Sequence, residues 1–213
     1  MTAKEPVSVL GAAMVGAALV RSLARSGRAV IIGVRHPDAE DVRNLVEELG
    51  SGSVATTPRD AIAASEVVIA AVPGVAMAGL IDACATELAG RIVLDATNNL
   101  SEGHASGKLS ALPCLAAAVP TALGYRAFNS VGWENMADPS FNGVQADLFY
   151  AGPDISERTA VERLITDVGF RPQYVGAGAD AHLAVDTLTT LWFALAFGQK
   201  RGRHLALRLL TDT

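Results

Sequence analysis

The apolar positions of this chain fall into short blocks that alternate between the spacing of a strand and that of a helix. An apolar run of strand length at residues 7–10 is followed by a turn of small residues at 11–16. Leucines and alanines at helical spacing occupy residues 17–26, Gly27 ends them, and a β-branched run follows at residues 29–34. Strand, turn, helix and strand within about thirty residues predict one βαβ unit.

The same alternation continues along the chain. Apolar runs predict further strands at residues 53–56, 67–72, 91–95 and 124–128. Stripes at helical spacing predict helices at residues 38–49, 57–64, 77–88 and 108–119. Strands that alternate with helices are typical of a doubly wound sheet. We therefore expect an α/β fold, a Rossmann-type doubly wound parallel sheet.

The last third of the chain has a different pattern. It predicts a strand at residues 146–152, a helix at 156–168 and a strand at 171–175. Residues 181–210 form a long apolar region at helical spacing, which Gly198 and Gly202 bend or interrupt. This region is too polar at both ends to predict a membrane span. We expect it to cover the open edge of a cleft or to pack against a partner chain, which makes the chain a candidate homodimer.

Length and composition suit one domain. The chain has 213 residues, half of them apolar and 18% charged, which is enough to fill a single core. We expect one domain over residues 1–213, with a helical C-terminal cap over residues 178–213 as part of it. The net charge of −5 and the scattered basic residues argue against a nucleic-acid partner. The first residues lead straight into a strand without a signal-peptide pattern, so we expect a cytoplasmic protein.

Side chains that could hold a metal or act as an acid–base pair do not cluster in the sequence. Cys84 and Cys114 stand alone, and the four histidines lack the spacing of metal ligands. The two cysteines are interpreted as small core residues. We therefore expect no metal, and no catalytic residue is assigned from the sequence.

The turn after the first strand carries the clearest chemical signal. It reads Gly11, Ala12, Ala13, Met14, Val15, Gly16, which matches the dinucleotide pattern G-x-G-x-x-G except at its middle position. In that pattern, free N–H groups at the start of the helix face a pyrophosphate. A methyl group at Ala13 loosens this approach without abolishing it. We interpret the turn as a dinucleotide site; the alternative is that its glycines only allow the helix to pack closely on the strand.

The end of the second strand indicates which dinucleotide binds. NAD sites place an acidic residue there to accept a hydrogen bond from the ribose 2′-hydroxyl. This chain has Val34, Arg35 and His36 at that point, with no acid before Asp38. The guanidinium of Arg35 can pair with a 2′-phosphate, so we expect NADP(H). The alternatives are that Arg35 is an exposed loop residue without a ligand, and that His36 is a loop neighbour rather than a second phosphate contact.

Two later strand ends are further candidates, because ligands bind at the carboxyl ends of strands in open α/β sheets. Val72, Pro73 and Val75 follow one strand and Asn98 follows the next. The structural alternatives are an ordinary Pro-Gly turn in the first case and an Asx turn built on Asn98 and Asn99 in the second.

Several segments together resemble the short NADPH-dependent oxidoreductases typified by NADP:coenzyme F-420 oxidoreductase. The matching segments are VLGAAMVG, IIGVRHP, AAVPGVA, LDATNN, the ending WFALAF…LALRLL, which is similar to the family's helical C-terminus, and, most specifically, RAFNSVGWENM at residues 126–136. The resemblance implies that the glycine turn cradles the pyrophosphate, that Val34 and Arg35 hold the 2′-phosphate, and that Val72 to Val75 line the adenosine side. It also implies that Asn98, Asn129 and Gly132 border the nicotinamide. Ala13 and Ala39 depart from the family's pattern and put the affinity for NADP in question.

The resemblance further implies hydride transfer between NADP(H) and a deazaflavin or flavin-like acceptor. Such a reaction needs two rings held face to face and little acid–base chemistry. Asn129, Trp133 and Trp192 are the candidate substrate residues, although packing is the favoured role for each tryptophan. Two alternatives remain open: an NADPH-dependent reductase of another small acceptor, such as an imine, a carbonyl or a ferric chelate, and a non-catalytic NADPH-binding sensor.

Overall fold

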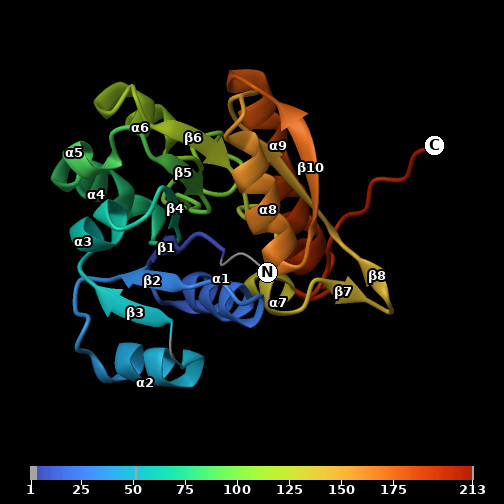
Figure 1. Ribbon diagram of the computed structural model, residues 1–213. Helices are drawn as coiled ribbons and strands as arrows, with labels where there is room; N and C mark the ends of the chain where they lie inside the picture. Colours follow the sequence, from blue (N-terminus) through green and yellow to red (C-terminus); the bar gives the residue numbers. More distant parts are fainter. Residues whose placement is uncertain (1–3, 51, 213) are drawn as a thin grey trace.

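The structure, a computed structural model, describes residues 4–50 and 52–212, and its centre is a single large sheet (Figure 1). Within these residues, eight strands lie in the order β10-β9-β6-β5-β4-β1-β2-β3. The first six are β1 (Val7–Leu10), β2 (Val30–Gly33), β3 (Ser53–Thr56), β4 (Val67–Ala70), β5 (Ile92–Asp95) and β6 (Leu123–Arg126). Every neighbouring pair among these six is parallel. The predicted Rossmann-type doubly wound sheet is confirmed, with its switch point between β1 and β4.

Helices cover both faces of this sheet. They are α1 (Met14–Arg25), α2 (Glu40–Leu49), α3 (Pro58–Ala63), the short 3-10 turn η1 (Gly74–Ala76), α4 (Met77–Ala83), α5 (Ala85–Leu88) and α6 (Leu112–Ala118). Leu19 and Leu23 of α1 belong to the core on one face, whereas Ile62 of α3 and Ile81 of α4 belong to the core on the other. Each helix therefore buries an apolar stripe against the sheet, as its spacing predicts.

Some element boundaries differ from the predicted ones for local reasons. α1 begins at Met14 rather than at residue 17, because Ala13 is extended and already acts as the N-cap. β4 ends at Ala70, two residues before Val72, and Pro73 lacks the N–H that a longer ladder would need. The helix expected at residues 77–88 is divided at Cys84, whose φ of −124° is not helical.

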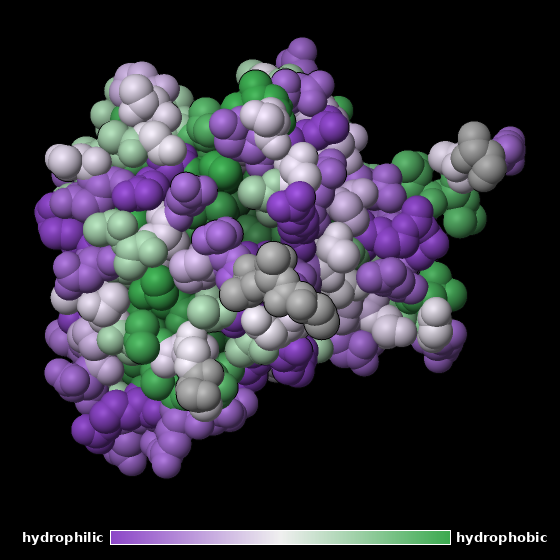
Figure 2. Space-filling view, in the orientation of Figure 1, coloured by the Kyte–Doolittle hydropathy of each residue, from purple (hydrophilic) through white to green (hydrophobic). Residues whose placement is uncertain are grey.

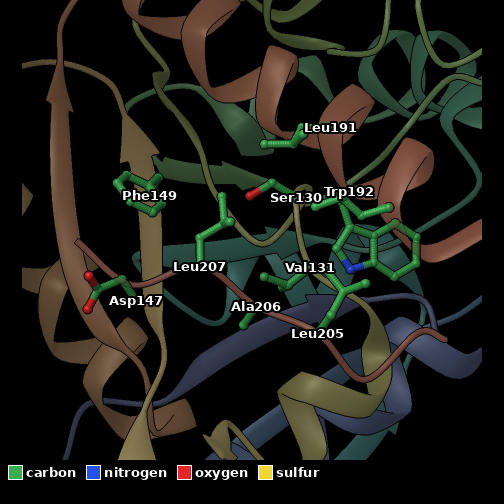
Figure 3. Close-up of a pocket in the computed structure, with 10 residues that line it drawn as sticks. Ser130, Val131, Asp147, Phe149, Leu191, Trp192, Leu205, Ala206 and Leu207 are labelled. Carbon is green, nitrogen blue, oxygen red and sulfur yellow. The ribbon is translucent and has the colours of Figure 1, made fainter. Parts of the chain in front are cut away.

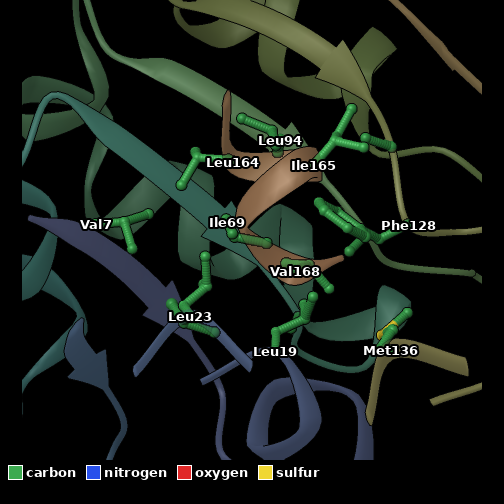
Figure 4. Close-up of a cluster of buried hydrophobic side chains, with 14 of the residues drawn as sticks. Val7, Leu19, Leu23, Ile69, Leu94, Phe128, Met136, Leu164, Ile165 and Val168 are labelled. Atoms are coloured by element: carbon green, nitrogen blue, oxygen red, sulfur yellow. The ribbon is translucent and has the colours of Figure 1, made fainter. Parts of the chain in front are cut away.

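The segment after β6 completes the sheet. It contains α7 (Trp133–Ala137), the hairpin of β7 (Ser140–Phe141) and β8 (Val144–Gln145), β9 (Asp147–Ala151), α8 (Arg158–Val168) and β10 (Arg171–Gly176). β9 pairs antiparallel with β6, and β10 pairs parallel with β9. The hairpin was not predicted, because two residues per strand are too few to show alternation. α1, α7 and α8 meet on one face, where their side chains form the largest part of the core (Figure 4).

The C-terminal region is helical only in its first part. α9 (Ala179–Phe193) continues into a π-helical turn, η2 (Ala194–Gly198), so a helical C-terminal segment is confirmed. The expected helix over residues 199–210 is wrong, because this stretch runs without helix along β9 instead. Asp147 N donates to Leu207 O at 3.1 Å, and Leu209 N donates to Asp147 Oδ2 at 2.6 Å. These bonds satisfy the backbone that a helix would otherwise have satisfied internally.

α9 and η2 have one face in the fold and one face in solvent. By length and composition, residues 179–198 are the only stretch of the described chain that could cross a membrane, and 28% of its most apolar window is buried. Ala181 and Val185 pack on the end of β9. The opposite face exposes Leu183, Leu191 and Phe197 by 55%, 42% and 50%. Polar residues cover most of the face shown in Figure 2, where apolar residues gather in depressions and beside the C-terminal end.

Candidate functional site

Two glycines in the turn between β1 and α1 are required by packing. Gly11 has a φ of +105°, and a Cβ there would lie 2.8 Å from Ala71 O. A Cβ on Gly16 would lie 2.1 Å from Gly11 O. Side chains are therefore excluded at both positions, which brings the start of α1 against the ends of β1 and β4.

The start of α1 presents unpaired backbone donors. Its N-cap Ala13 makes no side-chain cap, and its first turn holds no acidic residue. The first N–H bonded within the helix belongs to Ala17, which donates to Ala13 O at 2.7 Å. The N–H groups of Met14, Val15 and Gly16 have no acceptor among the described residues. An exposed helix start with free N–H groups and no competing carboxylate fits the pyrophosphate of a dinucleotide.

Arg35 lies at the same edge of the sheet as this helix start. Gly11 N donates to Gly33 O at 2.9 Å, which joins the glycine turn to the end of β2. Arg35 and His36 are exposed, and neither side chain has a hydrogen bond or ion pair with a described residue. Val34 is half-buried against the core and orients the loop. A free guanidinium two residues past β2 fits a 2′-phosphate.

The loops after β4 and β5 pack directly on each other. A Cβ on Gly74 would lie 2.5 Å from Asn99 N, so the Pro-Gly turn touches the next loop. Val72 is half-buried, whereas Pro73 and Val75 are exposed. Asn99 Oδ1 accepts hydrogen bonds from the N and Oγ of the residue two positions on, at 3.2 and 2.7 Å. The Asx alternative therefore holds for Asn99, and it leaves Asn98 for another role.

A buried arginine, which the sequence analysis missed, organises the next two strand ends. Arg126 is 0% exposed; its Nε donates to Asp186 Oδ1 at 2.7 Å, and its Nη1 lies 3.2 Å from Asp95 Oδ2. The same guanidinium donates to the carbonyls of Asp95 and Thr97 at 3.0 and 2.6 Å, and to Asn98 Oδ1 at 2.9 Å. Arg126 therefore ties the ends of β5 and β6 to α9. The sequence did offer a signal for both residues. Arg126 is a charged residue within the apolar pattern of a strand, and Asp186 is one within the apolar pattern of a helix.

The two asparagines predicted to border the nicotinamide both join this network. Asn98 Nδ2 donates to Asn129 O at 2.8 Å. Asn129 Nδ2 donates to Asp186 Oδ1 at 3.2 Å and to Thr189 Oγ1 at 2.9 Å. These donations fix the amide orientation of Asn129, and its buried Oδ1 has no partner among the described residues. The residue before it, Phe128, has a φ of +65°, a backbone conformation that bulky side chains rarely adopt.

Asp186 is the least satisfied member of the network. Burial raises the pKa of its carboxyl, although Arg126 acts to lower it. Its Oδ1 accepts from two donors, whereas its Oδ2 accepts no hydrogen bond from a described residue and is not sealed from solvent. His182, one turn earlier on α9, has a pKa lowered mainly by burial. A carboxyl with a raised pKa at the end of a sheet is a candidate functional group.

Trp192 walls a small apolar pocket beside this network (Figure 3). The pocket is lined from the loop after β6, from α9 and from the C-terminal stretch by Ser130, Val131, Leu191, Trp192, Leu205 and Leu207, among others. Trp192 is 7% exposed, and its Nε1 has no acceptor among the described residues. A Cβ on Gly132 would lie 3.1 Å from the Trp192 ring. Trp133 is half-buried against the main core, and the part of the chain that the structure describes holds no cluster suited to a metal ion.

Comparison with known proteins connects this geometry to a family. Residues 6–99, from β1 to the loop after β5, match the family model described as NADP oxidoreductase, coenzyme F420-dependent. Over these residues the chain is similar to that family. The resemblance seen in the sequence and the prediction of an NADP-dependent oxidoreductase are both confirmed, and the acceptor is left open. No protein of curated function matches the chain by sequence.

Solved structures share the fold over almost the whole chain. One from Arthrobacter sp. FB24, provisionally named an F420-dependent NADP reductase, has a TM-score of 0.83 at 24% identity, with 98% of this chain and 100% of that one covered. A hypothetical protein from Sinorhizobium meliloti has a TM-score of 0.72 at 25% identity, with 98% and 97% covered. A reductive aminase from Aspergillus terreus, in complex with NADPH and ethyl-5-oxohexanoate, has a TM-score of 0.67 at 21% identity. The match covers 92% of this chain but only 63% of the length of that enzyme.

Proposed function

We propose that this chain transfers a hydride between NADP(H) and a deazaflavin or flavin-like acceptor. The observation that carries the proposal is the open start of α1 beside the free guanidinium of Arg35. In this arrangement the N–H groups of Met14 and Val15 hold the pyrophosphate and Arg35 holds the 2′-phosphate. The loops that contain Pro73 and Asn98 then lead the cofactor toward β6. Residues 1–213 act as one NADP-binding unit, with α9 as its cap.

The role of the remaining residues is to hold and shield the rings. Bound NADPH supplies the hydride and its nicotinamide becomes positively charged. A flat conjugated acceptor spreads the charge of the added hydride over its ring, so the site needs alignment and exclusion of water. Trp192 forms an apolar wall next to the loop of Asn129, on the side where the acceptor would stack. Gly132 lies against the Trp192 ring, whereas Trp133 packs on the main core.

Cofactor binding gives the first test. NADPH and NADH are titrated into wild-type protein, Arg35→Ala and Arg163→Ala, with binding followed by nucleotide fluorescence. Loss of one charged hydrogen-bonding partner is worth about 1.5–3 kcal/mol, so Arg35→Ala should weaken NADPH about 10- to 100-fold and leave NADH unchanged. Arg163 is an equally exposed arginine on α8 and serves as the matched control. Equal and weak binding of both nucleotides to the wild type would contradict the proposal.

Asp186 favours a second candidate, the reduction of an imine or a carbonyl. Such an acceptor takes a proton together with the hydride, and the Asp186 carboxyl has a raised pKa and an open Oδ2. NADPH oxidation is therefore measured with coenzyme F-420, FMN, a cyclic imine and a ferric chelate. Rapid reduction of the deazaflavin that survives Asp186→Asn supports the first candidate. Reduction of the imine alone, lost in Asp186→Asn, supports the second, and tight binding without any turnover favours a sensor.

We also propose that the enzyme is a cytoplasmic homodimer that pairs through the exposed face of α9. Leu183 and Leu191 of α9 and Phe197 of the adjoining η2 are 42–55% exposed, which is unusual for three large apolar side chains along one helical segment. Leu183→Asp should convert the dimer to a monomer in sedimentation velocity at micromolar concentration. Val54→Asp, at a β3 residue of equal exposure, is the control. A strictly monomeric wild type would refute this pairing.

A further inference from the structure

The buried network at the ends of β5 and β6 contains more negative than positive charge. Arg126 pairs with Asp186 at 2.7 Å and with Asp95 at 3.2 Å, and the three side chains are almost fully buried. The charged groups that act on Asp186 are Arg126, Asp95 and His182. Burial keeps the ring of His182 neutral by lowering its pKa. When both carboxyls are ionised, two carboxylates share one guanidinium, and the cluster carries one net negative charge.

Asp186 accepts fewer hydrogen bonds than Asp95, although its Oδ1 lies closer to the Arg126 guanidinium, at 2.7 Å against 3.2 Å. Both oxygens of Asp95 are held by donors: Oδ1 accepts from Thr97 N and Oγ1 at 3.0 and 2.7 Å, and Oδ2 accepts from Ser110 Oγ and Ala111 N, both at 2.8 Å. Asp186 accepts only at Oδ1, from Arg126 and Asn129. Its Oδ2 accepts no hydrogen bond from a described residue and is not sealed from solvent.

The net negative charge of this cluster lies next to the loops of Asn98 and Asn129, which are the proposed borders of the nicotinamide site. In the proposed function, on which this inference rests, Asn98 and Asn129 border the nicotinamide. Asn129 is bonded directly to Asp186, and Asn98 is bonded to Arg126. The nicotinamide ring is neutral in NADPH and carries a positive charge in NADP⁺, so a fixed negative charge one side chain away distinguishes the two forms.

We propose that the net negative charge of the cluster of Arg126, Asp95 and Asp186 makes this site bind NADP⁺ more tightly than NADPH, which shifts the equilibrium between the bound reactants toward the reduced acceptor. In that direction the C4–H bond of the cofactor breaks with both electrons, the acceptor is reduced and the ring gains its positive charge. The ionised Asp186 stabilises that positive charge and has no comparable interaction with the neutral ring. A unit charge within about 12 Å, in a medium of effective dielectric about 20, changes a binding ratio by a factor of about ten or more.

The test compares two dissociation constants and needs no turnover. NADP⁺ and NADPH are titrated by calorimetry into wild type, Asp186→Asn and Asp180→Asn at pH 7.5. Asparagine keeps the Oδ1 acceptor for Arg126 and Asn129 and leaves Arg126 paired one-to-one with Asp95, so the fold should survive. We expect Asp186→Asn to lower the preference for NADP⁺ about tenfold, which corresponds to about 30 mV in the potential of the bound two-electron couple. Asp180 is exposed on the first turn of the same helix. Asp180→Asn removes an equal charge and should leave the preference for NADP⁺ unchanged.

Each outcome decides a separate question. Tight binding of both nucleotides with the same ratio in wild type and Asp186→Asn overturns this inference and leaves the proposed function standing. Failure of the wild type to bind either nucleotide overturns the proposed function and the inference with it. The wild-type ratio is a second measurement that needs no folded variant: tighter binding of NADPH than of NADP⁺ contradicts the proposal.

Discussion

Replacing Arg126 by methionine should destabilise the protein more than any exposed charge replacement. The guanidinium is 0% exposed and supplies the cation for Asp95 and Asp186, together with hydrogen bonds to two carbonyls and one amide. Methionine fills a similar volume and offers no donor. The folded variant must therefore keep two buried carboxyl groups without a counter-charge.

The general cost of breaking a buried ion pair gives the expected loss in the free energy of unfolding. Removing one partner of such a pair costs about 3–5 kcal/mol, because the other charge stays buried and uncompensated. We expect about 4 kcal/mol, a large part of the 5–15 kcal/mol that typically stabilises a domain. For a chain of this length, the melting temperature should fall by about 8–16 °C.

The loss should depend on pH with a defined sign. Burial already raises the pKa of Asp186, and Arg126 is the group that opposes this rise. Without Arg126 the folded-state pKa of Asp186 rises further above its unfolded value of about 3.9. A raised folded pKa gives stability that is present below the unfolded pKa and is lost as pH rises through the folded value. The deficit of Arg126→Met should therefore be largest at neutral pH and should shrink toward pH 4.

Urea unfolding at fixed protein concentration, followed by tryptophan fluorescence and circular dichroism, measures this deficit. Arg21→Met removes the exposed pair with Glu48, 2.8 Å apart, and should cost less than about 1 kcal/mol. Adding Asp186→Asn to Arg126→Met should recover about 1–2 kcal/mol, because one orphaned charge is removed. A loss below about 1 kcal/mol in Arg126→Met, or simple addition of the two losses in the double variant, would refute this account of the network.

Three further changes test other parts of the site. Ala13→Gly removes a methyl group from the exposed N-cap of α1 and should tighten NADPH binding a few-fold, measured by fluorescence titration. Gly16→Ala would place a Cβ 2.1 Å from Gly11 O, so urea unfolding should show a loss of more than about 2 kcal/mol. Burial lowers the pKa of His182, so the stability it gives is present above the unfolded pKa of about 6.5 and is lost as pH falls through the folded value. His182→Gln should therefore flatten the unfolding free energy between pH 7 and pH 5.

The N-terminal half was predictable because its information is local. Each strand and helix there buries a stripe whose period is readable within one short window, and the Thr57 cap accepts from Asp60 N at 3.3 Å, as its sequence position suggests. The glycine turn was also predictable from a short window, because its pattern places Gly11 and Gly16 where the structure leaves no room for a side chain. The assignment of Arg35 to a 2′-phosphate remains a prediction of the sequence, which the free guanidinium supports.

The network around Arg126 was not predictable, because its members are distant in sequence. Arg126 and Asp186 are 60 residues apart, and their pairing depends on where α9 crosses the sheet. Periodicity identifies a helix in residues 179–193 but not the strand end that it covers. The helix predicted for the C-terminal stretch was wrong for a related reason. Its backbone bonds to a residue distant in sequence, because Leu207 O accepts from Asp147 N and Leu209 N donates to Asp147 Oδ2. A stretch rich in leucine therefore establishes neither a helix nor burial by itself, since Leu209 and Leu210 are 47% and 84% exposed.

The arrangement of α9 explains why the cap and the chemistry cannot be separated in this chain. Val185 fixes the helix on the end of β9, while Asp186, the next residue, reaches across to Arg126. One turn further on, Thr189 bonds the loop of Asn129, and Trp192 then closes the apolar pocket. A helix that only covered the sheet would bury an apolar stripe at these positions. Because α9 buries a carboxylate and a hydroxyl against the strand ends instead, any movement of the cap also moves the two groups that hold Asn129.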